Sequence, residues 1–305
     1  MRSVLKKGEF MYCEVRGHDD HSYDTVARRD STLILIRTLL SKGDIDRKGA
    51  NSVKMMSTLL KASPILVIPS RRADAFQDGV LYLRYGIPMM TLNTLWEYIV
   101  EMIPPLIFYG PGGHYVSLDG ARLRSRREAM NLSLGALADE VGVSRKAIQM
   151  YESGMGATVE IALKLEEILR EVLISPLDPF SYSEELSYIR EKMDQIGGLK
   201  KQVFDHLDAI GMEVIPTMSC PFDAITRSSG SQFMTSVEMT NPRLRDMGEA
   251  LSDLSKITEQ RSVMIVSGKV RDKNIEGTPV LSLSEVKKTS DPEKLIEMIR
   301  ERCIP

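Results

Sequence analysis

The stretch Leu134–Gly154, LGALADEVGVSRKAIQMYESG, holds two short helical patterns joined by a tight corner at residues 142–144. The first pattern has one apolar stripe, which is formed by Leu137, Ala138 and Val141. Gly142 can adopt the positive φ that so abrupt a turn usually needs, and Ser144 stands where the N-cap of a helix belongs. The stretch therefore predicts a helix-turn-helix unit, in which the second helix enters the major groove of DNA.

The second helical pattern divides into an inner and an outer face. Ala147, Ile148 and Tyr151 continue the core, which leaves four side chains pointing outward: Arg145, Lys146, Gln149 and Met150. Arg or Lys can donate twice to guanine, Gln can pair with adenine, and Met can touch a thymine methyl group. The alternative is a two-helix corner inside an ordinary α domain, with its charged residues merely solvated.

Two further helices are predicted around the corner. Residues 119–130 are typical of a helix that crowds four arginines into six positions: Arg122, Arg124, Arg126 and Arg127. Such a cluster suits phosphate contacts, which fix the register on DNA without reading its sequence, although a basic face can also be only solvated. Residues 158–169 form an amphipathic helical pattern with Thr158 as its N-cap.

From about Arg122 to Leu169 the chain resembles a Cro/C1-type (phage repressor-like) helix-turn-helix domain. The resemblance is carried by the segments LRSRREA at 123–129, LADEVGVS at 137–144 and AIQMYESG at 147–154, and by the closing helix. It implies that bases are contacted by Ser144, Arg145, Lys146, Gln149 and Met150. It also implies a structural pair between Arg127 and Glu152. Leu134 stands where a polar, phosphate-contacting residue is common in this family.

Composition bounds the remaining possibilities. The 305 residues are 43% apolar and 27% charged, with a formal net charge of −2, so any affinity for DNA must come from a local basic patch. No apolar run reaches the ~18 residues of a membrane span, and residues 1–10 do not resemble a signal peptide. The three cysteines are far apart, which predicts reduced thiols and a cytoplasmic protein rather than a zinc site or a disulfide framework.

The two flanks of the helix-turn-helix follow one plan, α-β-β-β-α-β-α. The strongest parallel joins Tyr23–Arg28 with Phe222–Arg227, and further parallels join residues 33–38 with 233–239, 64–70 with 261–267, 78–83 with 276–281, and 92–100 with 291–301. Duplication is the favoured interpretation, and two unrelated α/β units of similar size are the alternative. Proline and glycine clusters at 103–106, 110–113 and 175–179 indicate linkers.

The predicted fold is therefore α/β plus all-α, with a lambda-repressor-like domain between two similar α/β domains. We expect an N-terminal α/β domain at 1–112, a Cro/C1-type DNA-binding domain at 113–175, and a C-terminal α/β domain at 176–305 that repeats the first. The α/β plan, with an Asp at the start of one strand and an acid in the next, resembles the restriction-endonuclease-like fold.

Nucleases of that fold pair an Asp with a later Glu/Asp-x-Lys, whose carboxylates hold a divalent metal. Here Asp223 is followed by Glu238-Met239-Thr240, so a Thr replaces the Lys, and Asp24 is followed by Ile36-Arg37-Thr38, without the second acid. Asp24, Asp223 and Glu238 are thus predicted to be remnants, with no catalytic residue, metal or cofactor. The run His18-Asp19-Asp20-His21 has metal-ligand residue types but is interpreted as a polar loop.

Over its full length the chain resembles archaeal helix-turn-helix transcriptional regulators of the Cro/C1 (XRE-like) class. The resemblance implies a sequence-specific regulator that binds double-stranded DNA, without catalysis and as a homodimer on paired half-sites. The first alternative is a metal-dependent nuclease that the helix-turn-helix delivers to its target. The second is an assembly protein whose corner binds another protein.

Overall fold

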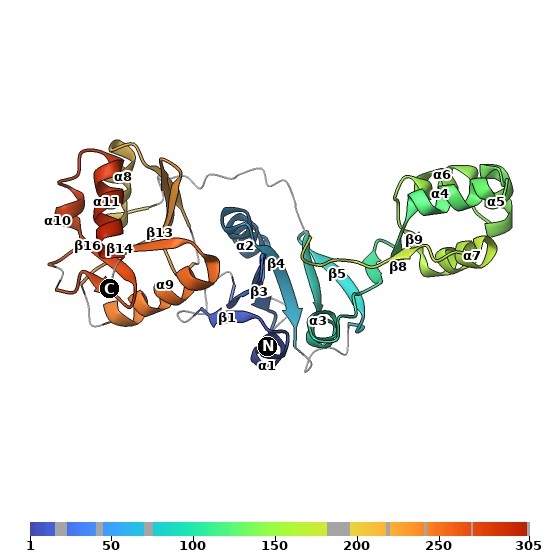
Figure 1. Ribbon diagram of the computed structural model, residues 1–305, viewed down its shortest axis with the longest axis horizontal. Helices are drawn as coiled ribbons and strands as arrows, with labels where there is room; N and C mark the ends of the chain where they lie inside the picture. The colour runs from blue at the N-terminus through green and yellow to red at the C-terminus, as the bar shows by residue number, and fades with distance from the viewer. Residues whose placement is uncertain are drawn as a thin grey trace. The chain divides into compact units, whose positions relative to one another are not determined.

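The computed structural model describes residues 1–15, 23–40, 45–69, 76–181, 196–217, 220–240, 243–269 and 271–303 (Figure 1). Contacts divide the chain into two units: Met1–Gly8 with Ile65–Tyr182, and Glu9–Pro64 with Ser183–Pro305. This division passes through the stretch 1–112 that the sequence predicts as one domain, because strands from residues 11–38 share a core with the C-terminal half.

The first unit is built on a mixed sheet in the order β4-β6-β5-β7-β8-β10, with β9 also paired to β8. Its strands are β4 (Ser63–Ile68), β5 (Val80–Arg84), β6 (Ile87–Thr91), β7 (Ile107–Gly110), β8 (Gly113–Leu118), β9 (Ala157–Thr158) and β10 (Ile174–Ser175). Helix α3 (Leu92–Ile99) follows β6 directly, since Thr91 caps it by accepting from the amide of Thr94, and α1 (Arg2–Lys7) packs against α3.

Four helices form the predicted all-α part of this unit: α4 (Gly120–Ala129), α5 (Leu134–Val141), α6 (Arg145–Glu152) and α7 (Val159–Leu169). Each begins after a residue whose side chain accepts from a first-turn amide, namely Asp119, Ser133, Ser144 and Thr158. Gly142 ends α5 with φ at 84°, the left-handed conformation that glycine adopts without a Cβ clash. Leu123, Leu137, Ile148 and Leu165 are fully buried in the common core.

Strand β8 joins this bundle to the rest of the unit. It pairs with β9 between α6 and α7 and with β10 after α7, and its residues Val116 and Leu118 enter the helical core. Residues 110–113, which the sequence predicts as a linker, instead form the turn of the β7–β8 hairpin. The sequence Pro-Gly-Gly favours a turn, and such a turn can close a hairpin as well as join two domains.

The second unit contains two sets of strands. The first is the antiparallel set β1 (Met11–Glu14), β2 (Thr25–Arg29) and β3 (Thr32–Thr38), which is followed by helix α2 (Arg47–Leu60). The second is a six-stranded sheet in the order β11 (Glu213–Pro216), β12 (Ala224–Ser228), β13 (Ser231–Glu238), β14 (Arg261–Val266), β16 (Thr278–Ser282) and β15 (Asn274–Ile275). Its helices are α8 (Gly198–Ala209), α9 (Leu244–Thr258), α10 (Leu283–Val286) and α11 (Pro292–Arg302).

The two α/β halves have the same order of elements and the same pairing, which supports duplication. In both, the first three strands are antiparallel, and the fourth pairs in parallel with the last, which closes an antiparallel hairpin with the fifth. Two parallels from the sequence need correction. Glu276-Gly277 turns a hairpin with positive φ at both positions, and its counterpart is Tyr85-Gly86 rather than the segment at 78. Helix α3, which starts right after β6, corresponds to α10 and not to α11.

The two sets of strands in the second unit share one apolar core. Tyr23, Val26 and Leu35 belong to it, and so do the matching residues Phe222, Ile225 and Met234. Arg28 of β2 reaches the end of α9, where its Nε and Nη2 donate to the carbonyl oxygens of Ile257 and Thr258 at 2.5 and 3.1 Å. Among the helices of the described residues, none combines the length and apolar character needed to cross a bilayer.

Candidate nucleic-acid interface

Helix α6 presents the predicted outer face to solvent. Ile148 and Tyr151 are buried beneath it, and all five residues assigned to base reading are exposed: Ser144, Arg145, Lys146, Gln149 and Met150. Met150 exposes 40% of its surface, although an apolar side chain of this size gains by being buried. A face that mixes cations, an amide and an exposed thioether matches the donor and apolar groups that major-groove base edges accept.

The start of α6 is fixed by Ser144 itself. Its Oγ accepts from the amide of Ala147 at 3.1 Å, so the hydroxyl oxygen caps the helix while its proton remains available to a ligand. Arg145 and Lys146 follow in the first turn, where the helix dipole adds positive potential. Within the part of the chain that the structure describes, neither of these two cations has a carboxylate partner.

Arg127 and Glu152 form a buried ion pair between α4 and the end of α6. Arg127 Nε lies 2.6 Å from Glu152 Oε1, Nη2 lies 3.2 Å from Oε2, and Nη1 donates to the carbonyl oxygen of Leu132 at 2.9 Å. The side chains expose only 9% each, and the hydrogen bond to Glu152 raises the pKa of Arg127. The sequence also assigned Arg127 to phosphate contacts. The structure corrects this, because the guanidinium is enclosed and its donors are already used.

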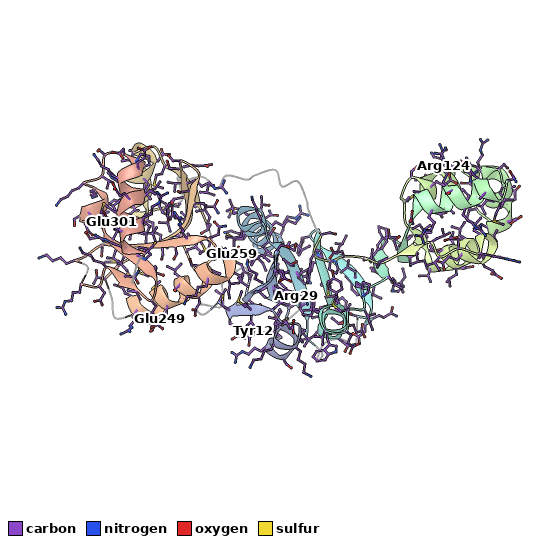
Figure 2. The ribbon with its side chains drawn as sticks, in the orientation of Figure 1. Tyr12, Arg29, Arg124, Glu249, Glu259 and Glu301 are labelled. Carbon is purple, nitrogen blue, oxygen red and sulfur yellow. The ribbon has the colours of Figure 1, made fainter. Side chains whose placement is uncertain are left out.

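The other three arginines of α4 remain accessible, with side-chain exposures of 54% for Arg122, 66% for Arg124 and 38% for Arg126. Figure 2 shows Arg124 projecting from the outside of the helical bundle. Each has a carboxylate nearby: Arg124 pairs with Glu128 at 3.0 Å, and Arg122 and Arg126 lie 3.8 and 4.0 Å from Glu171. The cluster is therefore less positive than a count of arginines suggests.

Sequence reasoning did not single out Ser133, which is the N-cap of α5. Its Oγ caps α5 by accepting from the amide of Ala136 at 3.0 Å, which leaves the amides of Leu134 and Gly135 at the helix start. Amides at a helix start attract phosphate oxygens. The amides of Leu134 and Gly135 are therefore backbone donors at the position where related domains commonly have a polar side chain and this chain has Leu134. The available signal was a serine directly before an apolar stripe.

A second group of chemistry-bearing residues lies in the C-terminal α/β half. Asp223 precedes β12 and Glu238 ends β13, and both line a cleft of about 600 Å³. Asp223 is held by the amide of Val237, which donates to its Oδ2 at 2.7 Å, while Lys200 Nζ lies 2.5 Å from its Oδ1. Burial, and then the charge of Asp223, raise the pKa of Glu238, and Lys200 partly opposes this.

Lys200 is the residue of this group that sequence reasoning missed. It comes from the first turns of α8, far from the Glu-x-Lys position where Thr240 stands, so no local motif announces it. The cleft is strongly acidic, since it is also lined by Glu14, Asp246, Glu249 and Asp253. Even so, among the described residues no three His, Cys, Asp or Glu side chains are arranged to hold a metal ion.

Asp24 is anchored in the same way as Asp223. Its Oδ2 accepts from the amide of Thr38 at 2.8 Å, as Asp223 Oδ2 accepts from Val237, but among the described residues its buried Oδ1 has no hydrogen-bond partner. Burial accordingly raises the pKa of Asp24. The register of β2 and β3 places Leu39 where the other half has Glu238, so this strand position offers Asp24 no second carboxylate. The run His18–His21 lies outside the described residues.

The capped corner, the exposed face of α6 and the pair that locks α6 to α4 define a helix-turn-helix protein. Residues 123–173 match the model of the helix-turn-helix family, and residues 1–105 match the model of the PD-(D/E)XK superfamily domain. The predicted fold class is thereby confirmed for the central and N-terminal parts.

Curated relatives extend the match over the whole chain. Proteins described as "Putative HTH-type transcriptional regulatory protein" from Methanocella arvoryzae and Methanococcoides burtonii are 34% identical to it, over 98% of this chain and 94% of their own length. One from Archaeoglobus fulgidus is 30% identical, over 98% of this chain and 95% of its own. The chain belongs to this family of archaeal HTH-type transcriptional regulatory proteins. No solved structure is a significant match.

Proposed function

We propose that the protein is a sequence-specific transcriptional regulator that reads the major groove of double-stranded DNA with α6. The observation that carries the proposal is the exposed start of α6, where Arg145 and Lys146 stand in the first turn of a helix capped by Ser144 and have no carboxylate partner among the described residues. The family to which the chain belongs supports the regulator role. It acts without a cofactor, and it works in the cytoplasm, where the DNA of an archaeal cell lies.

Each exposed residue of α6 has a chemical role in this proposal. Arg145 and Lys146 donate to guanine O6 and N7, Gln149 pairs with adenine, and Met150 contacts a thymine methyl group. Phosphates are bound by Arg122, Arg124 and Arg126, which exchange their present carboxylate partners for DNA, and by the amides at the start of α5. Arg127 and Glu152 only hold the recognition helix in place.

In vitro selection of binding sites tests base reading. Gln149→Ala is expected to relax specificity at one base pair, at a cost of about 1–3 kcal/mol in discrimination. Arg124→Ala is the contrasting variant, expected to weaken all sequences equally and to reduce the slope of log affinity against log salt by about one. If both variants left selection and salt slope unchanged, α6 would not be the reading element. The chain would instead be an assembly protein if two results were found together. Wild type would not bind DNA, and Arg145→Ala with Lys146→Ala would still bind the protein partner.

The protein binds as a homodimer in this proposal, with one α6 for each of two half-sites about one helical turn apart. The selected sites should then be palindromic, and sedimentation should show two chains for each duplex. A single chain on a single half-site, at micromolar protein, would refute the dimer.

A second candidate function is favoured by one observation, the contact of Lys200 with Asp223 beside Glu238. Two carboxylates with a lysine are the donor set of phosphodiester hydrolysis assisted by a divalent cation. Asp223 and Glu238 would hold a largely hydrated Mg²⁺, which keeps several waters and needs few protein ligands. The ion would supply a nucleophilic water at neutral pH, and Lys200 would orient that water.

Incubation of plasmid with the full chain and Mg²⁺ or Mn²⁺ separates the two functions. The regulator proposal predicts no cleavage. Cleavage that is lost in Glu238→Gln and Lys200→Met, but kept in the matched control Asp24→Asn, would establish the nuclease. Asp24 suits the control because it has the same backbone anchor, while Leu39 stands at the strand position that Glu238 occupies in the other half.

A further inference from the structure

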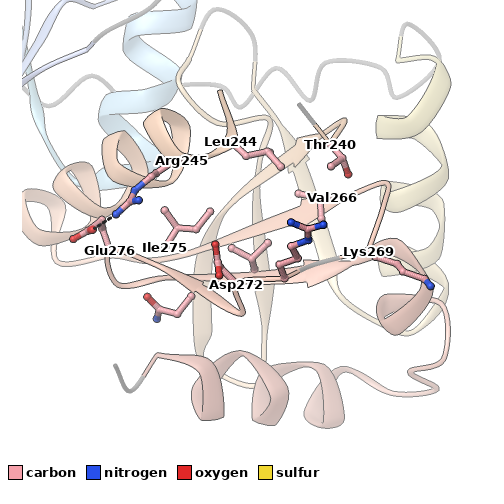
Figure 3. Close-up of a pocket in the computed structure, with 11 residues that line it drawn as sticks. Thr240, Leu244, Arg245, Val266, Lys269, Asp272, Ile275 and Glu276 are labelled. Atoms are coloured by element: carbon pink, nitrogen blue, oxygen red, sulfur yellow. Dashed lines mark hydrogen bonds and ion pairs between the residues drawn. The ribbon is translucent and has the colours of Figure 1, made fainter. Parts of the chain in front are cut away.

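A second cleft, of about 670 Å³, lies in the C-terminal α/β half and shares no lining residue with the acidic cleft at Asp223 (Figure 3). It opens where the parallel strands β13 and β14 end, because Thr240 lies just beyond β13 and Val266 is the last residue of β14. The carboxyl ends of parallel strands are where open α/β sheets place their ligands, and this volume is in the usual range of about 300–1,000 Å³ for small-molecule sites.

The lining is apolar on one side and charged on the other. Its apolar part consists of Leu244, Val266, Ile275 and Val280, of which Val266 and Val280 are almost completely buried. The backbone of Gly268 lies so close to Thr240 that a Cβ would collide with the threonine hydroxyl, which brings the loops after β13 and β14 together. The cleft therefore offers a preformed apolar surface beside a polar rim, as ligand sites generally do.

The charges of the rim are unequally paired. Arg245 at one end donates to Glu276 at 3.4 Å, the contact drawn in Figure 3, and Lys269 stands at the other end. Lys269 and Arg271 have no carboxylate partner within the described residues, and the remaining acid of the rim is Asp272. After Arg245 and Glu276 are set aside, the lining has an excess of one positive charge.

The start of α9 also borders the cleft, and its first turn carries one acid, Asp246, which lines the acidic cleft instead. Leu244 and Arg245 are the first two residues of the helix and both line the cleft, and the N-cap Arg243 supplies no side-chain oxygen to the first turn. The amides of that turn and the positive end of a 15-residue helix therefore border the cleft. Amides at a helix start, together with a Lys and an Arg, are the donors that bind phosphate groups in proteins.

We propose that this cleft binds a small molecule with a phosphate group attached to an apolar body. The phosphate takes hydrogen bonds from Lys269 and Arg271. The apolar body covers the half-buried side chains of Leu244 and Ile275. A bare inorganic anion leaves that apolar surface exposed, so it binds more weakly than an organic phosphate.

Calorimetric titration of the full chain with phenyl phosphate, and separately with inorganic phosphate, tests the site. Saturable binding of phenyl phosphate is expected, at least about tenfold tighter than that of inorganic phosphate, since each buried CH₂ contributes about 0.8 kcal/mol. Lys269→Ala with Arg271→Ala is expected to weaken phenyl phosphate about tenfold or more, because charge-assisted hydrogen bonds are lost.

Two control variants make the result specific. Arg261→Ala with Lys288→Ala removes the same charge from exposed positions of the same half outside the cleft, and affinity should not change. Arg145→Ala with Lys146→Ala removes the cations of α6, and binding should also persist. The proposal is overturned if phenyl phosphate shows no saturable binding, if inorganic phosphate binds equally well, or if only the α6 variant loses it.

Discussion

Tyr23 and Phe222 occupy equivalent positions in the two α/β halves, and only Tyr23 carries a hydroxyl group. Both rings are fully or almost fully buried in the shared core, yet the Tyr23 hydroxyl has no hydrogen-bond partner among the described residues. Tyr23→Phe should therefore raise the free energy of unfolding by about 1–3 kcal/mol, since a buried, unpaired hydroxyl costs that much. Urea unfolding of the full chain measures it.

The matched control is Tyr115→Phe. The hydroxyl of Tyr115 donates to the carbonyl oxygen of Pro111 at 2.7 Å, so its removal should lower stability slightly or leave it unchanged. A loss of stability in Tyr23→Phe would contradict the assignment of its hydroxyl as unpaired.

The buried pair of Arg127 and Glu152 is expected to be far more sensitive than the surface pairs around it. Arg127→Ala leaves Glu152 charged and enclosed, which should cost about 3–5 kcal/mol. Arg124→Ala breaks the exposed pair with Glu128 and should cost no more than about 0.5 kcal/mol. Equal unfolding midpoints for the two variants would show that the buried pair does not hold the recognition helix.

The contributions of Glu238 and Glu285 to the free energy of unfolding should change in opposite directions with pH. Burial raises the pKa of Glu238 above 4.5, so the stability that this group contributes is complete below pH 4.5 and is lost as pH rises through the raised value. Arg302 lowers the pKa of Glu285 to about 2, so its contribution is complete above 4.5 and is lost as pH falls toward 2. Glu238→Gln should then stabilise the protein at neutral pH but not below pH 4.5.

The measurement is the urea midpoint of wild type, Glu238→Gln and Glu285→Gln across this pH range. Glu285→Gln should be less stable than wild type at neutral pH, and the difference should shrink toward pH 2. A Glu238→Gln variant that is destabilised at neutral pH would mean that the buried carboxylate has a favourable partner there.

At the scale of elements, the helices of the central domain could be predicted closely. The caps Ser144 and Thr158, the apolar stripe of α5 and the glycine corner are local signals, and the structure places each as the sequence predicts. The pairing of Arg127 with Glu152 followed only from the family resemblance. Local patterns specify a helix and its ends, whereas contacts between helices depend on how the domain packs.

The α/β halves show where local patterns fail. The sequence comparison matches the Glu276-Gly277 turn with Gly79 instead of Gly86, because two short strands that each follow a glycine have similar sequences. It also does not predict Lys200 beside Asp223, since a helix and a strand 23 residues apart meet only in the folded sheet. Nor could it predict that the first three strands share a core with the C-terminal half.

Gly120, at the start of α4, lies so close to the end of α6 that no side chain fits between the two helices. A Cβ there would lie 2.5 Å from the carbonyl oxygen of Glu152 at the end of α6. Gly120→Ala should therefore destabilise the helical bundle by at least about 1–3 kcal/mol. Gly135→Ala in α5, whose Cβ would meet nothing closer than 3.8 Å, should instead stabilise it by about 0.4–1 kcal/mol. Circular dichroism during thermal unfolding distinguishes the two outcomes.

At the scale of the whole molecule, the second unit depends on contacts between the duplicated halves. Arg28 donates to two carbonyl oxygens at the end of α9 and pairs with Glu259 at 3.2 Å. The equivalent Arg227 reaches the other half only indirectly, because it donates to Gln232, whose Nε2 donates to the carbonyl oxygen of Leu59 at 3.3 Å. Arg28→Ala should lower stability by about 1.5–3 kcal/mol and make the two halves unfold in separate steps. Arg227→Ala is the control, expected to keep one transition; the same behaviour in both variants would contradict this role of Arg28.

Strand β8 anchors the helical bundle that contains α6. Because Val116 and Leu118 alternate into the helical core while the strand is paired with β7, β9 and β10, a slip of one residue would turn both of them outward. Insertions in the β7–β8 turn at residues 110–113 should therefore be tolerated. Within β8, an insertion or deletion keeps Val116 and Leu118 facing the core only if it changes the strand by an even number of residues. Among homologues, length variation should accordingly gather at that turn and spare the strand behind it.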